Sequence, residues 1–248
     1  MALLKKFETP YGTISVTRDK RDGALAYYQN GSFHSQADDK GDSICVYIHV
    51  LHEIIRQSRL RNILIIGCAG GTLATMLRRQ HCKVTIVDIN PMTFAIARDY
   101  FHMPDDVRCV RRDGIAYLRQ TPKIYDAVVV DVFGGDNTVP RAFTTAAFFQ
   151  NVREVLSPVG LMLMNFITAD DRDARADAIA RNAGLAGMDV TLFDWPRHKD
   201  RNTLIIGGAM PRIQIPSGRE PAWIRQELRG MIRRKPRRYR NSLNNNGF

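Results

Sequence analysis

From Asn62 onward, short apolar runs alternate with helical stretches, and this rhythm restricts the fold more than any other feature of the sequence. The runs ILII and VVV lack polar alternation, which is typical of strands covered by helices on both faces. Seven strands are predicted, at Ile63–Ile66, Lys83–Val87, Val107–Arg111, Ala127–Val130, Leu161–Asn165, Val190–Phe193 and Thr203–Ile206. Because helical stretches separate most of them, we expect an α/β fold with a doubly wound, mostly parallel, seven-stranded sheet. The last two strands are joined by a loop alone, which favours an antiparallel edge strand.

A small β-meander is expected before this sheet, in residues 1–41. Asn30-Gly31 lies between aromatic and apolar runs and is a strong hairpin signal, because both turn positions need a positive φ angle. The predicted strands are Thr13–Thr17, Ala24–Gln29 and Ser32–Gln36. Asp42 is a suitable N-cap for the helix that apolar spacing predicts over about Ser43–Gln57. The main domain is therefore expected at residues 42–210.

Positive charge is concentrated after the last predicted strand. The net charge is +11, and residues 211–248 contain ten Lys or Arg against two Glu, which leaves +3 for the rest. We expect a basic tail over 211–248, with a short helix at Trp223–Arg234 and disorder over Lys235–Phe248. The run Arg233–Arg240 could make a weak contact with a polyanion, although basic runs of this kind are more often only solvated.

The composition is that of a globular protein, with 44% hydrophobic and 25% charged residues. No apolar run approaches the roughly 18 residues of a membrane span, and the first residues lack the apolar core of a secretory signal. The four cysteines form no CxxC pair, and the six histidines have no metal-ligand spacing. We therefore expect a cytoplasmic protein with reduced thiols, no membrane contact and no metal.

The loop after the first central strand is the strongest sign of a ligand. It reads Gly67-Cys-Ala-Gly-Gly71 and stands between a buried strand and the start of a helix. Small residues let the backbone approach a nucleotide, and free amides at a helix start can donate hydrogen bonds to it. The spacing differs from GxGxxG, so the dinucleotide fingerprint is only partly met. Gly67, Ala69 and Gly71 are candidate cofactor contacts; the alternative is a tight turn that needs glycine for its geometry alone.

Four acidic residues follow strands at one edge of the predicted sheet. Asp88 ends the second strand, where a carboxylate can accept hydrogen bonds from ribose hydroxyls or cap the next helix. Asp113, before Gly114, could receive an adenine amino group or begin a helix. Asp131 ends the fourth strand, and Asp136 follows in an irregular stretch. Since the carboxyl ends of parallel strands border the ligand crevice, we expect these acids to converge there.

At these motifs the sequence resembles the spermidine synthase family, whose aminopropyltransferases share the Rossmann-like fold of class I methyltransferases. The likeness runs from about Gly12 to Gly208, and Ile65 stands two residues before the first loop glycine, where ordinary methyltransferases tend to have an acid. The resemblance implies contacts of Gly67, Ala69 and Gly71 with the cofactor, of Asp88 with its ribose, of Asp113 with its adenine, and of Asp131 with the attacking amine. Ile89 and Gly114 are further candidate cofactor contacts.

The sequence also departs from the family pattern. Gly70 stands where a synthase usually has an acid for the cofactor's aminopropyl ammonium, and Gly134 stands where a second acid of the fourth strand belongs. His34 roughly matches a glutamine expected after the hairpin. These differences indicate a divergent, spermidine synthase-like member. The remaining candidate substrate contacts are Asp136, Tyr47 and His34.

The resemblance implies transfer of an aminopropyl group from decarboxylated S-adenosylmethionine to a small amine or polyamine. Glycine at position 70 removes a repulsion against a cofactor carboxylate, which modestly favours S-adenosylmethionine itself, so methyl transfer is the alternative. A third interpretation is a non-catalytic cofactor-binding protein with a polyanion-binding tail. The sequence leaves the acceptor, the sulfonium donor and the oligomeric state open, with a homodimer among the alternatives.

Overall fold

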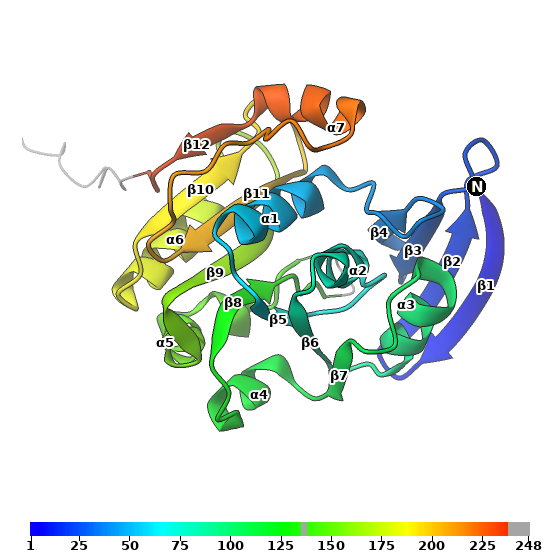
Figure 1. Ribbon diagram of the computed structural model, residues 1–248, viewed down its shortest axis with the longest axis horizontal. Helices are drawn as coiled ribbons and strands as arrows, with labels where there is room; N and C mark the ends of the chain where they lie inside the picture. The colour runs from blue at the N-terminus through cyan, green and yellow to red at the C-terminus, as the bar shows by residue number, and fades with distance from the viewer. Residues whose placement is uncertain (135–137, 238–248) are drawn as a thin grey trace, which may run out of the picture.

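The computed structural model describes residues 1–134 and 138–237, which form two β-sheets and the helices around them (Figure 1). The N-terminal sheet is antiparallel, and its strands follow chain order: β1 (Ala2–Thr9), β2 (Gly12–Arg18), β3 (Leu25–Gln29) and β4 (Ser32–Ala37). The expected meander is confirmed, and β1 is an additional strand. Because β1 is mostly exposed, it lacks the apolar alternation that identifies a strand in the sequence, and pairing with β2 holds it in place.

The central sheet contains all seven predicted strands and has the order β12-β10-β11-β9-β8-β5-β6-β7. Its strands are β5 (Asn62–Ile66), β6 (Lys83–Asp88), β7 (Arg108–Arg111), β8 (Tyr125–Val130), β9 (Leu156–Thr168), β10 (Val190–Asp194), β11 (Arg201–Gly207) and β12 (Ile232–Arg234). The strands β5 to β9 pair in parallel. Their carboxyl ends therefore share one edge, where β5 is flanked by β6 and β8.

The antiparallel strand β11 is not at the edge of the sheet, which corrects the sequence expectation. It lies between β9 and β10 and pairs antiparallel with both. The C-terminal strand β12 then pairs antiparallel with β10 and adds an eighth strand. Neither pairing is visible in the local apolar pattern, because a pattern of side chains identifies a strand but not its neighbours.

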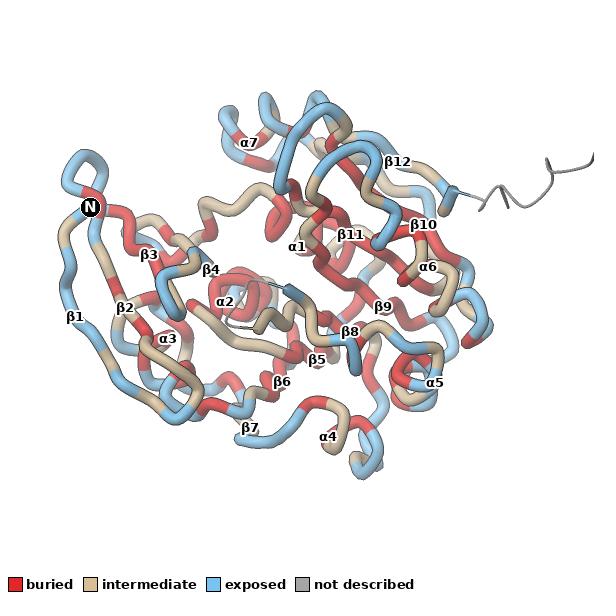
Figure 2. The backbone as a smooth tube through the Cα atoms, turned by 180° about the vertical axis from the view of Figure 1, so that it is seen from behind, coloured by how far each residue is buried: buried red, intermediate tan, exposed pale blue. Residues whose placement is uncertain are grey.

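Helices cover both faces of the central sheet. Alternate residues of β5 point to opposite faces, so that Ile63 and Ile65 pack with one set of helices and Leu64 and Ile66 with the other. The first set is α1 (Val46–Gln57), α2 (Thr72–Arg79), α3 (Met92–Phe101) and α7 (Ala222–Glu227); the second is α4 (Gly114–Gln120), α5 (Ala146–Glu154) and α6 (Arg175–Leu185). Figure 2 shows the central strands as mostly buried, in contrast to β1.

Two local predictions are wrong. Asp42 does not cap α1, because the helix begins at Val46 after Cys45, and the Asp42 carboxylate pairs with Arg79 instead. The helix expected over Trp223–Arg234 is interrupted: α7 ends at Glu227, a short 3-10 helix follows at Leu228–Gly230, and β12 begins at Ile232. Within the described residues, no helix has the length and apolar character needed to cross a membrane.

Candidate functional site

The loop between β5 and α2 contains positions that require small residues. Gly67 has a φ angle of 96°, and a Cβ atom there would lie 2.2 Å from the carbonyl oxygen of Asp131. Only glycine can therefore bring the loop this close to the end of β8. Ala69 and Gly71 also have positive φ angles, of 44° and 64°, and Gly71 is the N-cap of α2. The loop turns sharply at the carboxyl edge of the sheet.

Asp88 lies beside this loop at the end of β6. Its carboxylate accepts hydrogen bonds from the backbone N–H of Cys68 at 2.9 Å and of Asn90 at 2.8 Å. Burial raises the pKa of Asp88 above its ordinary value, although these backbone donors act in the opposite direction. Since a carboxylate has about four acceptor positions, these backbone donors leave at least one for a ligand.

Asp113 begins α4, as one of its two sequence interpretations anticipated. One carboxylate oxygen accepts the backbone N–H of Ala116 at 2.8 Å, which caps the helix. The next residue, Gly114, is buried, and a Cβ atom there would lie 2.4 Å from a methyl carbon of Ile66. Glycine thus allows the start of α4 to pack directly on β5.

These residues border a cavity of about 500 Å³, here named the inner cavity. Its lining includes the candidate residues Gly67, Ala69, Asp88, Ile89, Asp113, Gly114, Asp131 and His34. Tyr11 and Gln29, from the N-terminal sheet, also line it. The volume lies within the ~300–1,000 Å³ of small-molecule sites. The fold therefore brings three strand-end acids to one ligand-sized space.

Asp131 carries a small hydrogen-bond network at the border of this cavity. The Tyr47 hydroxyl donates to one carboxylate oxygen at 2.9 Å, and the Asn165 amide donates to the other at 3.0 Å. Asn202 in turn donates to the Asn165 side-chain oxygen at 3.0 Å. These partners come from α1, β9 and β11, so three separate elements fix the orientation of one carboxylate.

The electrostatic setting of Asp131 differs from that of an exposed carboxylate. Burial raises its pKa, and the hydrogen bonds from Asn165 and Tyr47 offset this only in part. Burial also raises the pKa of Tyr47 well above 10, so its hydroxyl remains a donor at neutral pH. Asp131 keeps unused acceptor positions next to the inner cavity, because each of its two partners occupies one of about four.

A second and larger space, of about 890 Å³, adjoins the first and is here named the outer cavity. Tyr47, Asn165 and Asn202 line it, so the partners of Asp131 face the outer cavity while Asp131 itself borders the inner one. His34 and Phe133 line both cavities, which places the junction at these side chains. The network of Asp131 therefore lies between two adjacent spaces.

His34 has an unusual position at this junction. Its Nε2 atom is buried without a hydrogen-bond partner among the described residues. The ring makes edge contacts with Tyr27 and Phe133, each with 6.3 Å between ring centroids. Burial lowers the pKa of His34, so the imidazole is neutral at pH 7. An unpaired buried nitrogen at the meeting point of two cavities is suited to a ligand contact.

The space around Gly70 is already occupied. A Cβ atom there would lie 2.8 Å from the Ser35 hydroxyl oxygen and 3.1 Å from a ring carbon of Phe101. The N-terminal sheet and α3 thus fill the volume that a longer side chain would need. A residue larger than glycine at position 70 would therefore require Ser35 or Phe101 to shift.

The remaining candidates and the residues that sequence reasoning missed can now be placed. Gly71 borders only a small hollow of about 20 Å³ next to Tyr47 and Asp131, and not the inner cavity itself. Asp136 lies outside the described residues. Asn165 was missed, although it ends a predicted strand at the same edge as Asp131, and the rule applied to the acids would have found it. In the described parts of the chain, no group of His, Cys, Asp or Glu side chains is arranged to hold a metal ion.

Comparison with known proteins gives a consistent result. Residues 48–167 match the family described as spermine/spermidine synthase domain. A polyamine aminopropyltransferase of Chromobacterium violaceum is 34% identical over 117 residues, which are 45% of this chain and 44% of that protein. A probable polyamine aminopropyl transferase of Bifidobacterium longum is 32% identical over 149 residues, 57% of this chain and 33% of that protein. The chain thus spans less than half the length of both relatives.

Methyltransferases also appear among the relatives. A protein of Drosophila melanogaster described as an eEF1A lysine and N-terminal methyltransferase homolog is 28% identical over 123 residues, 45% of this chain and 18% of that protein. The alignment is therefore confined to a small part of that relative.

Solved structures extend the likeness to nearly the whole fold. A probable spermidine synthase from Corynebacterium glutamicum superposes with a TM-score of 0.76 at 20% identity, covering 95% of this chain and 91% of that one. Human methyltransferase-like protein 13, in complex with SAH, superposes with a TM-score of 0.56 at 20% identity, covering 80% and 97%. The chain is thus similar to spermidine synthases: residues 48–167 match the spermine/spermidine synthase domain, and the fold is that of solved spermidine synthases and methyltransferases.

Proposed function

We propose that this chain is a transferase that binds an adenosyl sulfonium cofactor in the inner cavity and passes its aminopropyl group to an amine in the outer cavity. The observation that best supports this proposal is the position of Asp131. It borders the inner cavity, while Tyr47 and Asn165, which hold it, line the outer one. The aminopropyltransferase relatives support this choice of reaction.

The residues around the inner cavity fit an adenosyl group. Asp88 has acceptor positions left for the ribose hydroxyls, and Asp113 keeps one carboxylate oxygen free of helix capping, as an adenine amino group requires. The positive φ angles of Gly67 and Ala69 let the backbone of the loop come close to the ligand. When bound, the cofactor supplies an electrophilic carbon beside a sulfonium, from which the acceptor amine displaces a neutral thioether.

Asp131 has the main chemical role in this proposal. An amine becomes nucleophilic only after it loses a proton, and a carboxylate with a raised pKa is a better proton acceptor than an exposed one. Tyr47 and Asn165 fix the carboxylate in place, so its free lone pairs point at a defined position. His34 lies at the junction of the cavities and contacts the acceptor there.

Methyl transfer from S-adenosylmethionine is the second candidate, and the surroundings of Gly70 favour it. Without a loop acid there is no carboxylate to pair with an aminopropyl ammonium and none to repel a cofactor carboxylate. Ser35 and Phe101 fill that space instead. The methyltransferase relatives are consistent with this alternative.

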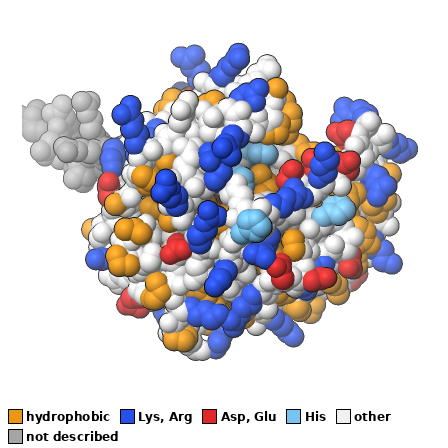
Figure 3. Space-filling view, viewed as in Figure 1, with side chains coloured by type: hydrophobic (Ala, Val, Ile, Leu, Met, Phe, Trp, Pro, Cys, Tyr) orange, Lys and Arg blue, Asp and Glu red, His pale blue; other side chains and the backbone are white. Residues whose placement is uncertain are grey.

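The third interpretation, a polyanion-binding tail, loses part of its basis. The guanidinium groups of Arg234 and Arg237 are paired with Asp177. Basic side chains are also spread over the face seen in Figure 3, with acidic side chains between them. Arg238 and Arg240 of the same run lie outside the described residues.

One assay separates the three functions. The protein is incubated with decarboxylated S-adenosylmethionine or S-adenosylmethionine and a panel of amines, including putrescine and spermidine, and the nucleoside product is identified by mass spectrometry. Methylthioadenosine is the expected product and shows aminopropyl transfer. S-adenosylhomocysteine would show methyl transfer instead. Cofactor binding by calorimetry without either product would leave the non-catalytic function.

A further inference from the structure

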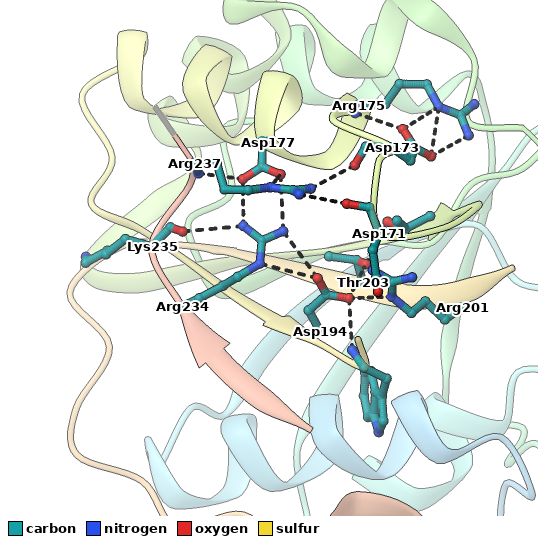
Figure 4. Close-up of polar contacts among 12 residues, drawn as sticks. Asp171, Asp173, Arg175, Asp177, Asp194, Arg201, Thr203, Arg234, Lys235 and Arg237 are labelled. Carbon is teal, nitrogen blue, oxygen red and sulfur yellow. Dashed lines mark hydrogen bonds and ion pairs between the residues drawn. The ribbon is translucent and has the colours of Figure 1, made fainter. Parts of the chain in front are cut away.

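The last described residues, 232–237, form a segment that runs along the edge of the central sheet beside β10 and packs on α6 (Figure 4); it is here named the C-terminal strap. Its strand β12 pairs with β10 over only three residues. A strand pairing of only three residues contributes little to the stability of the strap by itself. Side-chain contacts must therefore hold the strap in place.

Asp177 of α6 is the centre of these contacts. It is 1% exposed, and its two carboxylate oxygens accept four hydrogen bonds from the strap. Arg234 donates two of them, at 2.6 and 3.2 Å, and the backbone N–H and Nε of Arg237 donate the others, at 2.6 and 2.9 Å. The acceptor capacity of this carboxylate is fully used.

The strap also fixes the loop that leads into α6. Arg237 donates to the backbone carbonyl oxygens of Asp171 and Asp173, at 2.9 Å each. The Asp173 carboxylate in turn pairs with Arg175, the first residue of the helix. The strap therefore contacts both the loop and the body of α6.

Two further ion pairs extend this network to β10 and β11. Arg234 pairs with Asp194 of β10 at 3.3 Å. Asp194 also pairs with the buried Arg201 of β11 at 2.7 Å, and Arg201 reaches Asp171 at 3.0 Å. The strap, the two strands and the loop before α6 thus form one connected set of ion pairs (Figure 4).

The same elements form a wall of the outer cavity. Four residues of α6, spaced at i, i+3, i+4 and i+7, line it: Arg175, Ala178, Ile179 and Asn182. Asp200 and Asn202, on either side of Arg201, line it as well. On a helix of 3.6 residues per turn, Asp177 points away from this lining face. Helix α6 is therefore held by the strap on one side and borders the cavity on another.

We infer that the C-terminal strap sets the shape of the outer cavity, with Asp177 and Arg234 as positioning residues for a bound acceptor that they do not touch. The cavity becomes an acceptor site only under the proposed function, whereas the control of α6 by the strap is independent of it. The strap should consequently affect acceptor affinity and leave the inner cavity, on the far side of Asp131, unchanged.

Arg234→Gln tests this inference, and Arg233→Gln is its matched control. Both remove one positive charge from β12, but among the described residues the exposed Arg233 side chain has no hydrogen-bond or ion-pair partner. Hydrogen exchange of residues 175–185 is followed in the full chain, together with the KM for putrescine and the dissociation constant of the sulfonium donor. We expect Arg234→Gln to speed exchange in α6 and to raise the acceptor KM by roughly fivefold or more, as in typical coupling between sites. The donor dissociation constant should match that of the control.

Three outcomes would overturn the inference. The exchange of α6 could be the same in both variants, the acceptor KM could stay unchanged despite faster exchange, or the donor affinity could fall as much as the acceptor affinity. A chain that transfers nothing to any amine would contradict the proposed function instead. The exchange measurement then still decides whether the strap holds α6, and Asp177→Asn provides a second variant for it.

Discussion

Two aspartates, Asp131 at the junction of the cavities and Asp177 beneath the C-terminal strap, show how neighbours decide what a carboxylate does. Asp131 is held by two neutral donors, and burial leaves its pKa raised. For Asp177, burial alone would raise the pKa, but hydrogen bonds from two arginines outweigh burial and lower it. The first carboxylate is poised to accept a proton, and the second is fixed in its charged form.

The two aspartates also differ in the number of unused hydrogen-bond acceptor positions on their carboxylates. Asp131 has two donors and therefore keeps lone pairs for a ligand. Asp177 has four and keeps none. Residue type alone would not separate a reactive carboxylate from a structural one; the charge and the number of its partners do.

The largest expected effect is on catalysis. Asp131→Asn retains the shape of the side chain and a hydrogen bond but loses the proton acceptor, so turnover should fall by about 10²–10⁴-fold. Stability should be unchanged or higher, since the raised pKa means that ionised Asp131 does not favour the folded state. Steady-state kinetics and thermal unfolding measure the two effects. Near-normal turnover would place Asp131 among the structural residues and remove the contrast with Asp177.

Asp177→Asn should instead lower the stability of the protein and leave binding of the sulfonium donor intact. Asp177 is buried, whereas the Arg234 and Arg237 side chains are 17% and 47% exposed, so loss of its charge should cost at most the about 3–5 kcal/mol of unfolding free energy that breaking a fully buried pair costs. Denaturant titration provides the measurement. Asp177 contacts none of the side chains of the Asp131 network, which are Tyr47, Asn165 and Asn202, so a folded variant should still bind the sulfonium donor. A loss of less than about 1 kcal/mol would show that the ion pairs of the strap behave like exposed ones.

The two aspartates should also respond to pH with opposite signs. An unfolded aspartate has a pKa of about 3.9. Folded Asp177 lies below this value, so its stabilisation is complete above about pH 4 and is lost as the pH falls through the folded pKa. Folded Asp131 lies above it, so the folded state is weakened as Asp131 ionises. We expect the stability gap between wild type and Asp177→Asn to narrow as the pH falls below the unfolded pKa of about 3.9, and the stability of Asp131→Asn relative to wild type to increase as the pH rises. Parallel curves would contradict both assignments.

Asp88→Ala tests whether a third aspartate, in the inner cavity, binds the ligand. Removing a charged acceptor of ligand hydrogen bonds should weaken binding of an adenosyl ligand by about 1–3 kcal/mol. Calorimetry with methylthioadenosine measures this, and Asp177→Asn is the control that should not change it. Unchanged affinity in a folded Asp88→Ala protein would show that the carboxylate serves only the Cys68 and Asn90 amides.

The smallest effect is expected at the exposed end of the strap. Lys235 pairs with Asp189, but both side chains are largely exposed, at 64% and 70%. Lys235→Ala should therefore change the unfolding free energy by less than about 1 kcal/mol, and salt should reduce the change further. Denaturant titration at two ionic strengths checks this. A loss of unfolding free energy comparable to that of Asp177→Asn would mean that burial does not explain the difference between the Lys235–Asp189 pair and the Arg234–Asp177 pair.

The sequence by itself determined the parallel core and most of the candidate site. Apolar runs such as Ile63–Ile66 identify strands because a strand covered on both faces needs no polar positions. The loop from Gly67 to Gly71 and the aspartates at strand ends follow from the same local order, since parallel strands place their carboxyl ends at one edge. That is why Asp88, Asp113 and Asp131 could be expected at one cavity before any coordinates.

Only the tertiary structure decided which residues meet across long stretches of chain. Tyr47 and Asp131 are 84 positions apart, and Asp177 and Arg234 are 57 apart. Nothing local in the sequence encodes such pairs, because the first depends on the packing of α1 on the central sheet and the second on the pairing of β12 with β10. Two residues of the basic run that looked like a solvated tail, Arg234 and Arg237, are therefore bound to α6, since ion pairing with a buried aspartate depends on position in the fold and not on composition.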